Sequence, residues 1–226
     1  MTELRVLSYN VLSLRRGTDL VAAVIRACEP DVVCVQEAPR FWAWRAQCAR
    51  LALDSGLRIV TGGRPAAANL LLARRDLRVV EARSFKLRWR PPLHRRGVAL
   101  GAFDVGGTPL VVASTHLSLE PHERLRQARA VTEIVRRYAA PAVLAGDVNE
   151  DPEDPAFGHL ATELADAYAA APDGDGLTST AEHPRRRIDA VFVDRRLEVV
   201  RCGVPDVPGL AAASDHRPVL AVVRVP

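Results

Sequence analysis

Short apolar runs separated by turn-forming residues recur along the whole chain and predict many β-strands. Most of these runs are rich in valine, leucine and isoleucine, and β-branched residues such as valine and isoleucine are enriched in strands. The expected strands cover residues 5–11, 31–36, 57–61, 69–73, 78–87, 98–105, 110–117, 142–145, 188–193, 197–202 and 218–225.

Stretches with a helical pattern of apolar positions lie between some of these strands. In residues 19–30, Asp19 is the expected N-cap and Pro30 the expected stop. The other expected helices cover 41–53, 121–140 and 154–168. Many strands with few helices between them predict two packed sheets with helices on the outside.

No change of composition and no low-complexity linker divides the chain, so we expect a single domain over residues 1–226. A loose internal echo is visible, because residues 5–37 and 110–147 both read as strand, helix and strand. The first of these segments ends in Gln-Glu and the second in Gly-Asp. The composition, 48% hydrophobic and 26% charged, is ordinary for a soluble globular protein.

The sequence also argues against several classes of protein. No apolar run reaches the roughly 18 residues that a membrane span needs, and the first expected strand starts too early for a secretory signal to precede it. The four cysteines show neither CxxC spacing nor a zinc pattern, so buried, reduced thiols are expected. We therefore expect a cytoplasmic protein, and a monomer.

The net charge is +4, and nearly all of the basic residues are arginine, with Lys86 as the only lysine. Arginine stays charged and its planar guanidinium suits phosphate, so an anionic partner is permitted. The excess of alanine, arginine and proline is equally typical of a GC-rich coding sequence. The net charge therefore does not by itself indicate an anionic partner.

Polar residues stand where several of the expected strands end or begin. They are Asn10, Glu37, His116 and Asp147 with Asn149 at C-terminal ends, and Asp189 and Asp215 with His216 at N-terminal ends. In a mixed sheet the N-terminal end of an antiparallel strand shares an edge with the C-terminal ends of its neighbours. All of these sites can therefore meet at one edge, where open α/β sheets hold ligands.

The residue types at this edge favour the chemistry of a hard metal ion. Carboxylate and amide oxygens select Mg²⁺ or Mn²⁺ over zinc, and Mg²⁺ needs few protein carboxylates because it keeps several waters. The two histidines add groups that exchange protons near neutral pH. Asp189 could hold one imidazole in a chosen tautomer. This set of groups indicates metal-assisted hydrolysis of a phosphate ester.

Six short motifs carry a resemblance to a known family. They are LSYNVL, VVCVQE, STHLSL, LAGDVN, RIDAVFV and SDHRPVL, and they occur in this order over almost the entire chain. Together they resemble the endonuclease/exonuclease/phosphatase superfamily, the divalent-metal-dependent phosphoesterases that include DNase I-like nucleases and neutral sphingomyelinases. The resemblance implies a four-layer α/β/β/α sandwich of two mixed, mostly antiparallel sheets with outer helices, and one active site at the edge.

Carried over by position, the resemblance implies a site for Mg²⁺ or Mn²⁺. Glu37 would be the principal ligand, Asn10 would assist it, and Asp215 would complete the metal region or orient the water. Some DNA-repair members carry an aspartate two residues after the asparagine of the first motif, where this chain has Leu12. The chain is thus more similar to the branches with two histidines, which act on DNA, lipid head groups or phosphotyrosyl adducts.

The resemblance also implies catalytic roles. Asp147 would orient or activate the attacking water, and Asn149 would position phosphate or metal. His216 would contact the scissile phosphate while paired with Asp189. His116 would stabilise the phosphoryl oxygens or assist the leaving group. The further acidic residues after Asn149 are explained adequately by helix capping and solvation.

A basic segment, residues 84–97, is the candidate for substrate binding. Its basic groups and its tryptophan suit phosphate positioning and base stacking. In the simpler interpretation the segment is a solvated hairpin that turns at Pro91-Pro92. The predicted substrate contacts are Arg88, Trp89, Arg90 and Arg96, the last of which is expected to reach the active site.

Three functions are compatible with these patterns. The favoured one is a Mg²⁺-dependent phosphodiesterase that acts on nucleic acid. The first alternative is the same chemistry on a phospholipid head group or a small phosphorylated metabolite. The sequence shows neither the exposed apolar loop nor the membrane helix expected of a lipid enzyme. The second alternative, a non-catalytic binding module, is disfavoured because no residue of the expected site looks replaced.

Overall fold

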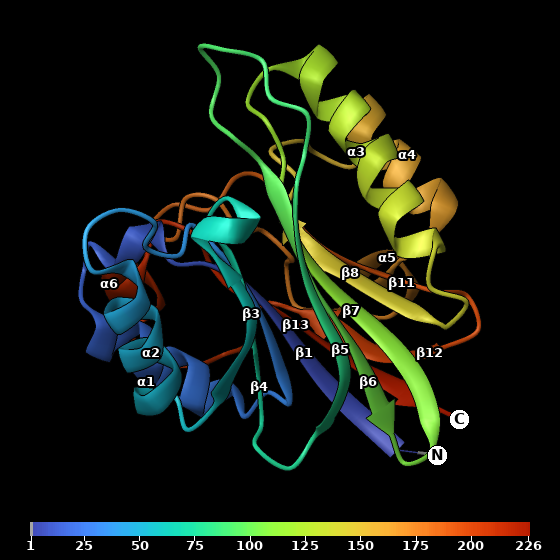
Figure 1. The fold of residues 1–226 in the computed structure, drawn as a ribbon, viewed down its shortest axis with the longest axis horizontal. Coiled ribbons are helices and arrows are strands. Elements are labelled where there is room, and N and C mark those ends of the chain that lie inside the picture. The colour runs from blue at the N-terminus through green and yellow to red at the C-terminus, as the bar shows by residue number, and fades with distance from the viewer. Residues whose placement is uncertain (1) are drawn as a thin grey trace.

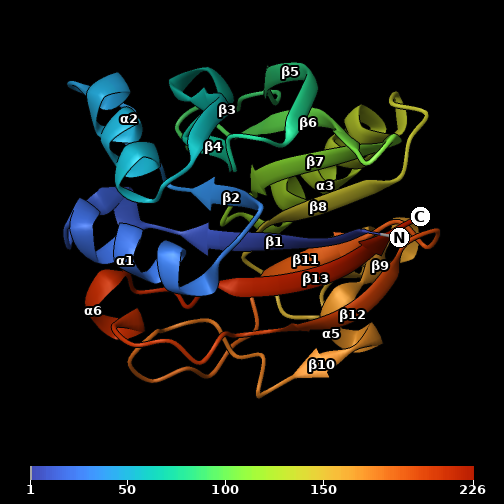
Figure 2. The ribbon, with the colours of Figure 1, turned by 90° about the horizontal axis from the view of Figure 1, so that it is seen from below.

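The computed structural model describes residues 2–226 and contains two β-sheets packed face to face, with helices on both outer faces (Figures 1 and 2). In Figure 1, α1 (Thr18–Cys28) and α2 (Trp44–Asp54) lie beside one sheet, and α3 (Pro121–Arg136) and α4 (Pro155–Glu163) lie beside the other. The four-layer sandwich expected from the sequence is therefore confirmed.

Among the described residues, the first sheet has seven strands in the order β10-β12-β13-β1-β2-β4-β3. In that order they are Pro172–Asp173, Glu198–Gly203, Val219–Val225, Thr2–Asn10, Val32–Gln36, Asn69–Ala73 and Arg58–Gly63. The β10·β12 and β1·β2 pairs are parallel, and the other pairs are antiparallel.

The second sheet has six strands within residues 2–226, in the order β5-β6-β7-β8-β11-β9. In that order they are Arg78–Lys86, Gly97–Val105, Thr108–His116, Ala142–Asp147, Asp189–Val193 and Ala165–Asp166. The β7·β8 pair is parallel and the others are antiparallel, so both sheets are mixed and mostly antiparallel, as predicted.

The internal echo seen in the sequence corresponds to two β-α-β units, one in each sheet. In the first, α1 joins the parallel strands β1 and β2, and in the second, α3 joins the parallel strands β7 and β8. Parallel neighbours end at the same edge, so Asn10 lies opposite Gln36 in one unit and His116 lies opposite Asp147 in the other. Each unit thereby delivers polar residues to one end of its sheet.

Three apolar layers hold the sandwich together, and β1 shows how the chain fills them. Leu4 and Val6 point into the core between the two sheets, whereas Leu7 and Tyr9 pack on the side of α1 and α2. A third core joins the second sheet to α3 and α4. Strands buried on both faces read as continuous apolar runs, which is why the strand pattern was easy to find in the sequence.

Four shorter helices complete residues 2–226. They are α5 (Ala167–Ala170), α6 (Leu210–Ala213) and the 3-10 turns η1 (Leu12–Leu14) and η2 (Arg64–Ala66). None of the described helices combines the length and the apolar composition that crossing a membrane requires. The cysteines are free and buried, as expected: Cys28, Cys34, Cys48 and Cys202.

Several boundaries of the predicted helices are wrong: the helix predicted over 41–53 begins at Trp44, and the one over 121–140 ends at Arg136. Helix α1 begins at Thr18 with Gly17 as its N-cap, so Asp19 is not the cap but lies in the first turn, where its charge still favours the positive end of the helix. The helix expected over 154–168 ends at Glu163. Leu164 is extended, and the next two residues pair with β11 as the short strand β9, which the sequence pattern did not reveal.

Candidate active site

Strand register brings three of the predicted residues into one row at the edge of the second sheet. Asp147 lies opposite His116 of the parallel strand β7 and opposite Asp189 of the antiparallel strand β11. The preceding glycine permits this close pairing, because a Cβ on Gly146 would lie 2.0 Å from the Thr115 carbonyl oxygen. The glycine of the motif LAGDVN is therefore required by the approach of two strands.

Asp147 is the centre of a hydrogen-bond network that joins the two sheets. Its Oδ2 accepts a bond from Asn10 Nδ2 of β1 at 3.0 Å and lies 3.3 Å from His116 Nε2. Its Oδ1 accepts a bond from the backbone N–H of Asn149 at 3.0 Å. The Asn149 amide is itself fixed, because its Nδ2 donates to the Leu117 carbonyl at 3.0 Å. The carboxylate is thus held in one orientation from three sides.

His216 and Asp189 form a second unit next to this network. His216 Nδ1 and Asp189 Oδ2 are 2.8 Å apart, so the predicted pairing is present in the structure. The other ring nitrogen, Nε2, lies 3.9 Å from Asp147 Oδ2. Asp189 is buried, and the Thr178 hydroxyl accepts a hydrogen bond from its backbone N–H at 3.2 Å. The ring of His216 is therefore oriented by a carboxylate that is itself fixed.

Burial and charge move the pKa values of these groups in different directions. Burial, together with the charge of Asp189, raises the pKa of Asp147 to about 7. Burial and the charge of Arg96 hold the pKa of His116 well below its usual value, which keeps that ring neutral. Burial alone would lower the pKa of His216, but Asp189 and the other carboxylates outweigh it and raise the value to about 10. One histidine is thus neutral and the other cationic.

Glu37 stands at the mouth of the same site. It follows β2 in the left-handed conformation, with φ of +53°, which turns the chain after the strand. Its Oε1 accepts only a long bond of 3.4 Å from Asn10 Nδ2. Asn10 Oδ1 accepts the Leu12 backbone N–H at 3.1 Å, so the Asn10 amide links Glu37 to Asp147. Glu37 therefore keeps free oxygen lone pairs that face the cleft.

Asp215, the third predicted metal-region residue, takes a more peripheral place. Its Oδ1 lies 3.4 Å from the Ser214 hydroxyl, and among the described residues it is not one of those that line the cleft. Its carboxylate contributes to the raised pKa of His216 after the larger effects of burial and Asp189. The structure therefore gives Asp215 an electrostatic influence on the site and no direct position in the cleft.

Two groups of side chains are suited to a metal ion. Ligand atoms of Asp147, Asp189 and His216 lie within 4.8 Å of one another, and Asp189 Oδ1 is buried without a hydrogen-bond partner. The second group is Glu37, which lines the cleft, with the buried Asn10 beside it. Mg²⁺ prefers oxygen ligands and retains several waters. The Glu37 carboxylate lines the cleft and fits such an ion better than the buried triad, whose histidine is held by Asp189.

The cleft at this edge has a volume of about 360 Å³ and places Glu37, His116, Asp147, Asn149 and His216 on its walls. The model of the Endonuclease/Exonuclease/phosphatase family matches residues 7–216. The chain belongs to the endonuclease/exonuclease/phosphatase family. Members of this family are metal-dependent phosphoesterases, so the predicted resemblance and the predicted class of enzyme, a metal-dependent hydrolase of ester bonds, are both confirmed.

Solved structures of the endonuclease/exonuclease/phosphatase fold resemble the whole chain. An endonuclease/exonuclease/phosphatase from Bacteroides vulgatus has a TM-score of 0.85 at 22% identity, with 100% of both chains covered. A mannosyl-6-phosphatase from Bacteroides thetaiotaomicron has a TM-score of 0.82 at 20% identity, covering 98% of this chain and 100% of its own. The human nocturnin catalytic domain with bound sulfate has a TM-score of 0.74 at 17% identity, covering 98% and 94%. No curated protein matches the chain.

Other basic and aromatic side chains, which the sequence motifs did not single out, also line the cleft of this chain. They are Arg15, Arg40, Phe41 and His94. Arg96, which was predicted, also lines the cleft, and burial lowers its pKa. Arg40 could have been found from the sequence by its position three residues after Glu37. Nothing in the local pattern of His94 separated it from an ordinary loop histidine.

The expectation that the chain has no exposed apolar loop is wrong. Phe41 and Trp42, between β2 and α2, are 78% and 90% exposed. They form a single aromatic pair, Phe41-Trp42, in a stretch whose pattern predicts the start of a helix, so their exposure could not be predicted from the sequence. The helix starts only at Trp44, because Ala43 takes a left-handed conformation.

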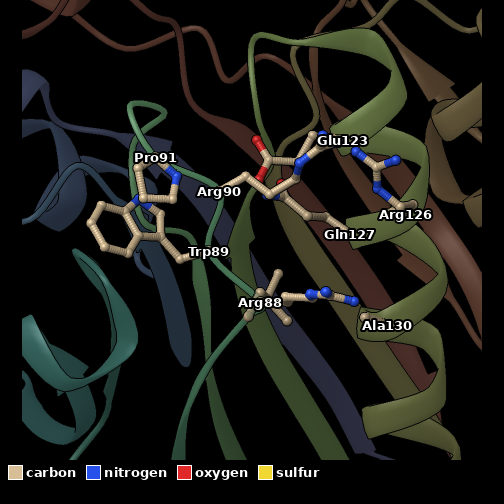
Figure 3. Close-up of a pocket in the computed structure, with 9 residues that line it drawn as sticks. Arg88, Trp89, Arg90, Pro91, Glu123, Arg126, Gln127 and Ala130 are labelled. Atoms are coloured by element: carbon tan, nitrogen blue, oxygen red, sulfur yellow. The ribbon is translucent and has the colours of Figure 1, made fainter.

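Three predicted substrate contacts, Arg88, Trp89 and Arg90, lie outside the cleft. Arg88 and Arg90 line a separate cavity of about 700 Å³ against α3, together with Glu123, Arg126 and Gln127. Figure 3 shows the side chain of Arg88 extended toward Ala130 of α3, whereas the ring of Trp89 lies on the other side of the hairpin. Contacts of Arg88 and Arg90 with a substrate stay a prediction that requires a substrate longer than the cleft.

Glu150, the first acid after Asn149, caps the start of α4 next to the cleft, as the capping interpretation predicted. Glu150 Oε2 accepts the backbone N–H groups of Ala156 and Phe157, at the start of α4, at 2.6 and 3.2 Å. Its Oε1 lies 3.0 Å from Arg124 Nε, and both side chains are less than a tenth exposed. Arg124 also donates to the Asn149 carbonyl, so this ion pair fixes the loop that carries Asn149.

Replacing Glu150 with alanine should lower the free energy of unfolding by about 3–5 kcal/mol, because it leaves the buried Arg124 charge without its partner. Urea denaturation followed by circular dichroism measures this change. Glu153 lies on the same loop but is exposed, so Glu153→Ala is the matched control and should change stability little. Equal stability of the two variants would show that the Arg124–Glu150 pair does not hold the loop.

Proposed function

We propose that this protein uses Mg²⁺, or Mn²⁺, to hydrolyse phosphodiester bonds, with nucleic acid as the favoured substrate. The observation that carries the proposal is the contact of Asp147 with His116, Asn10 and the Asn149 backbone, beside the His216–Asp189 pair. We also propose that residues 1–226 form one domain and that the protein is a cytoplasmic monomer.

Glu37 and Asn10 would hold the ion, since Glu37 has unused carboxylate oxygens at the cleft mouth and Asn10 links it to Asp147. When bound, the ion would polarise a phosphoryl oxygen and offset its negative charge. Asp215 would act on this region through its charge. The amide of Asn10 also keeps the two carboxylates of Glu37 and Asp147 in a fixed relation, which spares the site from reorganising during the reaction.

Asp147 would orient the attacking water and accept its proton. Its carboxylate is fixed by donors on both oxygens, so its remaining lone pairs point in defined directions. Asn149 would hold the phosphate next to it, because its left-handed backbone, with φ of +58°, brings its side chain onto the cleft wall. Positioning of this kind supplies much of the rate in phosphoryl transfer.

His216 would donate a hydrogen bond from Nε2 to the phosphoryl group, with Asp189 stabilising the cationic ring through Nδ1. His116 is neutral and would donate to a phosphoryl oxygen or to the leaving group. Arg96 adds a fixed positive charge to the same wall of the cleft. Together these donors would stabilise the charge that develops on the phosphoryl oxygens in the transition state.

A small phosphate ester is the second candidate substrate. The cleft itself, at about 360 Å³, has room for little more than one phosphorylated group. The similar structure from Bacteroides thetaiotaomicron is described as a mannosyl-6-phosphatase. Nucleic acid is preferred because Arg15, Arg40 and Arg96 line the cleft with no ion-pair partner among the described residues. Arg64 and Arg95 continue this positive charge beyond the cleft, which suits a chain of phosphates.

A panel of substrates tests the proposal. It should contain single-stranded and plasmid DNA, bis-p-nitrophenyl phosphate, p-nitrophenyl phosphate, a sugar phosphate and sphingomyelin, each with Mg²⁺ and with excess chelator. The proposal expects turnover of diesters that chelator abolishes. Turnover of the monoesters alone would replace it with the small-metabolite function, and turnover of none would favour the binding module.

Replacing Glu37 with alanine should weaken metal binding by at least about tenfold and leave the fold intact, because a carboxylate at the cleft mouth contributes little to packing. Titration with Mn²⁺, followed by electron paramagnetic resonance, measures free metal directly. Glu133→Ala, an exposed acid on α3, is the matched control and should bind as tightly as the wild type. Unchanged affinity in Glu37→Ala, or loss of cooperative unfolding, would contradict the assignment.

A further inference from the structure

A groove of about 850 Å³ opens beside the active-site cleft. The two hollows share Arg40, Phe41, Ala67 and His94 on their walls, so a ligand in the cleft can continue into the groove without leaving the surface. The groove runs between the Phe41-Trp42 loop and the β5–β6 hairpin, which projects beyond the sheets in Figure 1. No motif of the catalytic site accounts for this surface.

The charge of the groove is uniformly positive. Arg40, Arg64, Lys86 and Arg95 line it, and no acidic residue does so within the part of the chain that the structure describes. None of these four side chains forms an ion pair with another described residue, whereas many arginines elsewhere on the surface, such as Arg83, are paired with a nearby carboxylate. Unpaired cations gathered in a hollow are suited to an anionic ligand.

Aromatic rings stand between these cations. Trp42 is 90% exposed and Phe41 78%, and Trp89, on the opposite wall, is 41% exposed. The Trp89 ring is fixed, because its Nε1 donates to the Leu93 carbonyl at 2.6 Å and the Arg95 guanidinium lies 4.1 Å from its centre. Large exposed rings cost free energy in water, so their collection in one hollow indicates a flat ligand group.

We propose that this groove binds the unpaired nucleotides of a single-stranded nucleic acid whose scissile phosphate lies in the cleft. The inference rests on the proposed phosphodiesterase function and names the form of its substrate. Cations that follow the phosphates and rings that stack on bases are the combination that binds single strands. A duplex keeps its bases stacked inside, so it cannot offer them to the rings of Phe41, Trp42 and Trp89. A concave wall also fits a strand better than a flat bilayer surface.

Binding is measured with the whole protein in excess chelator, which separates it from turnover. The probe is a short fluorescein-labelled oligothymidylate, and its anisotropy gives the dissociation constant. Trp42→Ala and Trp89→Ala should each weaken binding by about tenfold or more, the usual effect of removing one stacking ring. Leu53→Ala is the matched control, since Leu53 is an exposed apolar residue of α2 outside the groove. Thermal unfolding checks that every variant is folded.

Salt dependence tests the cations separately. The double variant Arg64→Gln, Lys86→Gln should reduce the slope of log affinity against log salt by about 0.7 for each lost phosphate contact on a single strand. The double variant Arg129→Gln, Arg137→Gln removes two exposed charges of the α3 segment and should leave the slope unchanged. Equal slopes for both double variants would overturn the groove as the binding site.

The outcomes distinguish this inference from the function on which it rests. Metal-dependent cleavage of bis-p-nitrophenyl phosphate without oligothymidylate binding would overturn the groove and leave the phosphodiesterase intact. Oligothymidylate binding that Trp42→Ala weakens, without any turnover, would support the groove and overturn the phosphodiesterase. Equal affinity for duplex and single-stranded DNA would overturn the inference. It would also be overturned if the protein bound only anionic lipid vesicles and Trp42→Ala abolished that binding.

Discussion

Replacing Asp147 with asparagine should lower the turnover of bis-p-nitrophenyl phosphate by about two to four powers of ten, the range for a positioned proton-transfer group. Asparagine has nearly the same shape, but its amide has one acceptor oxygen, so it loses the proton acceptor and keeps the bond from only one of two donors, Asn10 Nδ2 and the Asn149 N–H. Asp147 is 1% exposed, and removing a buried charge relieves its desolvation. The lost hydrogen bond opposes this gain, so thermal stability should change little. Turnover near the wild-type value would remove Asp147 from the mechanism.

The second large effect concerns His216 and Asp189. His216→Ala should lower turnover of the same diester by about two to four powers of ten, because the donor to the phosphoryl group disappears. Asp189→Asn should cause a smaller loss, because the ring remains but its partner at 2.8 Å no longer stabilises the cation. The double variant should be hardly slower than His216→Ala alone, since residues that act as a unit are not additive.

Steady-state rates of the two single variants and the double variant complete this cycle. Asp206→Asn, an exposed acid in the loop before α6, is the matched control for the charge change and should turn over like the wild type. If the two single losses multiply in the double variant, the residues act independently. That outcome would contradict the positioning of His216 by Asp189.

The sequence was sufficient for the layers and for most of the site. Strands buried on both faces read as unbroken apolar runs, and a polar residue that ends such a run is conspicuous. Asn10, His116 and Asp147 were visible for this reason, and the β-α-β units place them at the same edge. To place Asp189 and His216 at this edge, we also had to infer that their strands run antiparallel to these neighbours.

Features decided by tertiary contacts could not be predicted in the same way. The exposure of Trp42 depends on a left-handed turn at Ala43, for which the sequence has no glycine signal. The short strand β9 forms only because β11 offers it an open edge. Arg88 and Arg96 belong to one basic segment, yet one lies against α3 and the other lines the cleft. Charge alone does not tell which side of a hairpin a residue faces.

The most direct test of the account is the metal dependence of bis-p-nitrophenyl phosphate hydrolysis by the wild-type protein. Rates are measured after exhaustive chelation and then during titration with Mg²⁺ and, separately, with Mn²⁺. We expect no turnover above background without metal and saturable recovery with either ion, since the proposed ligands Glu37 and Asn10 carry oxygen atoms. Full turnover in excess chelator would show that this cleft is not a metal-dependent phosphoesterase site.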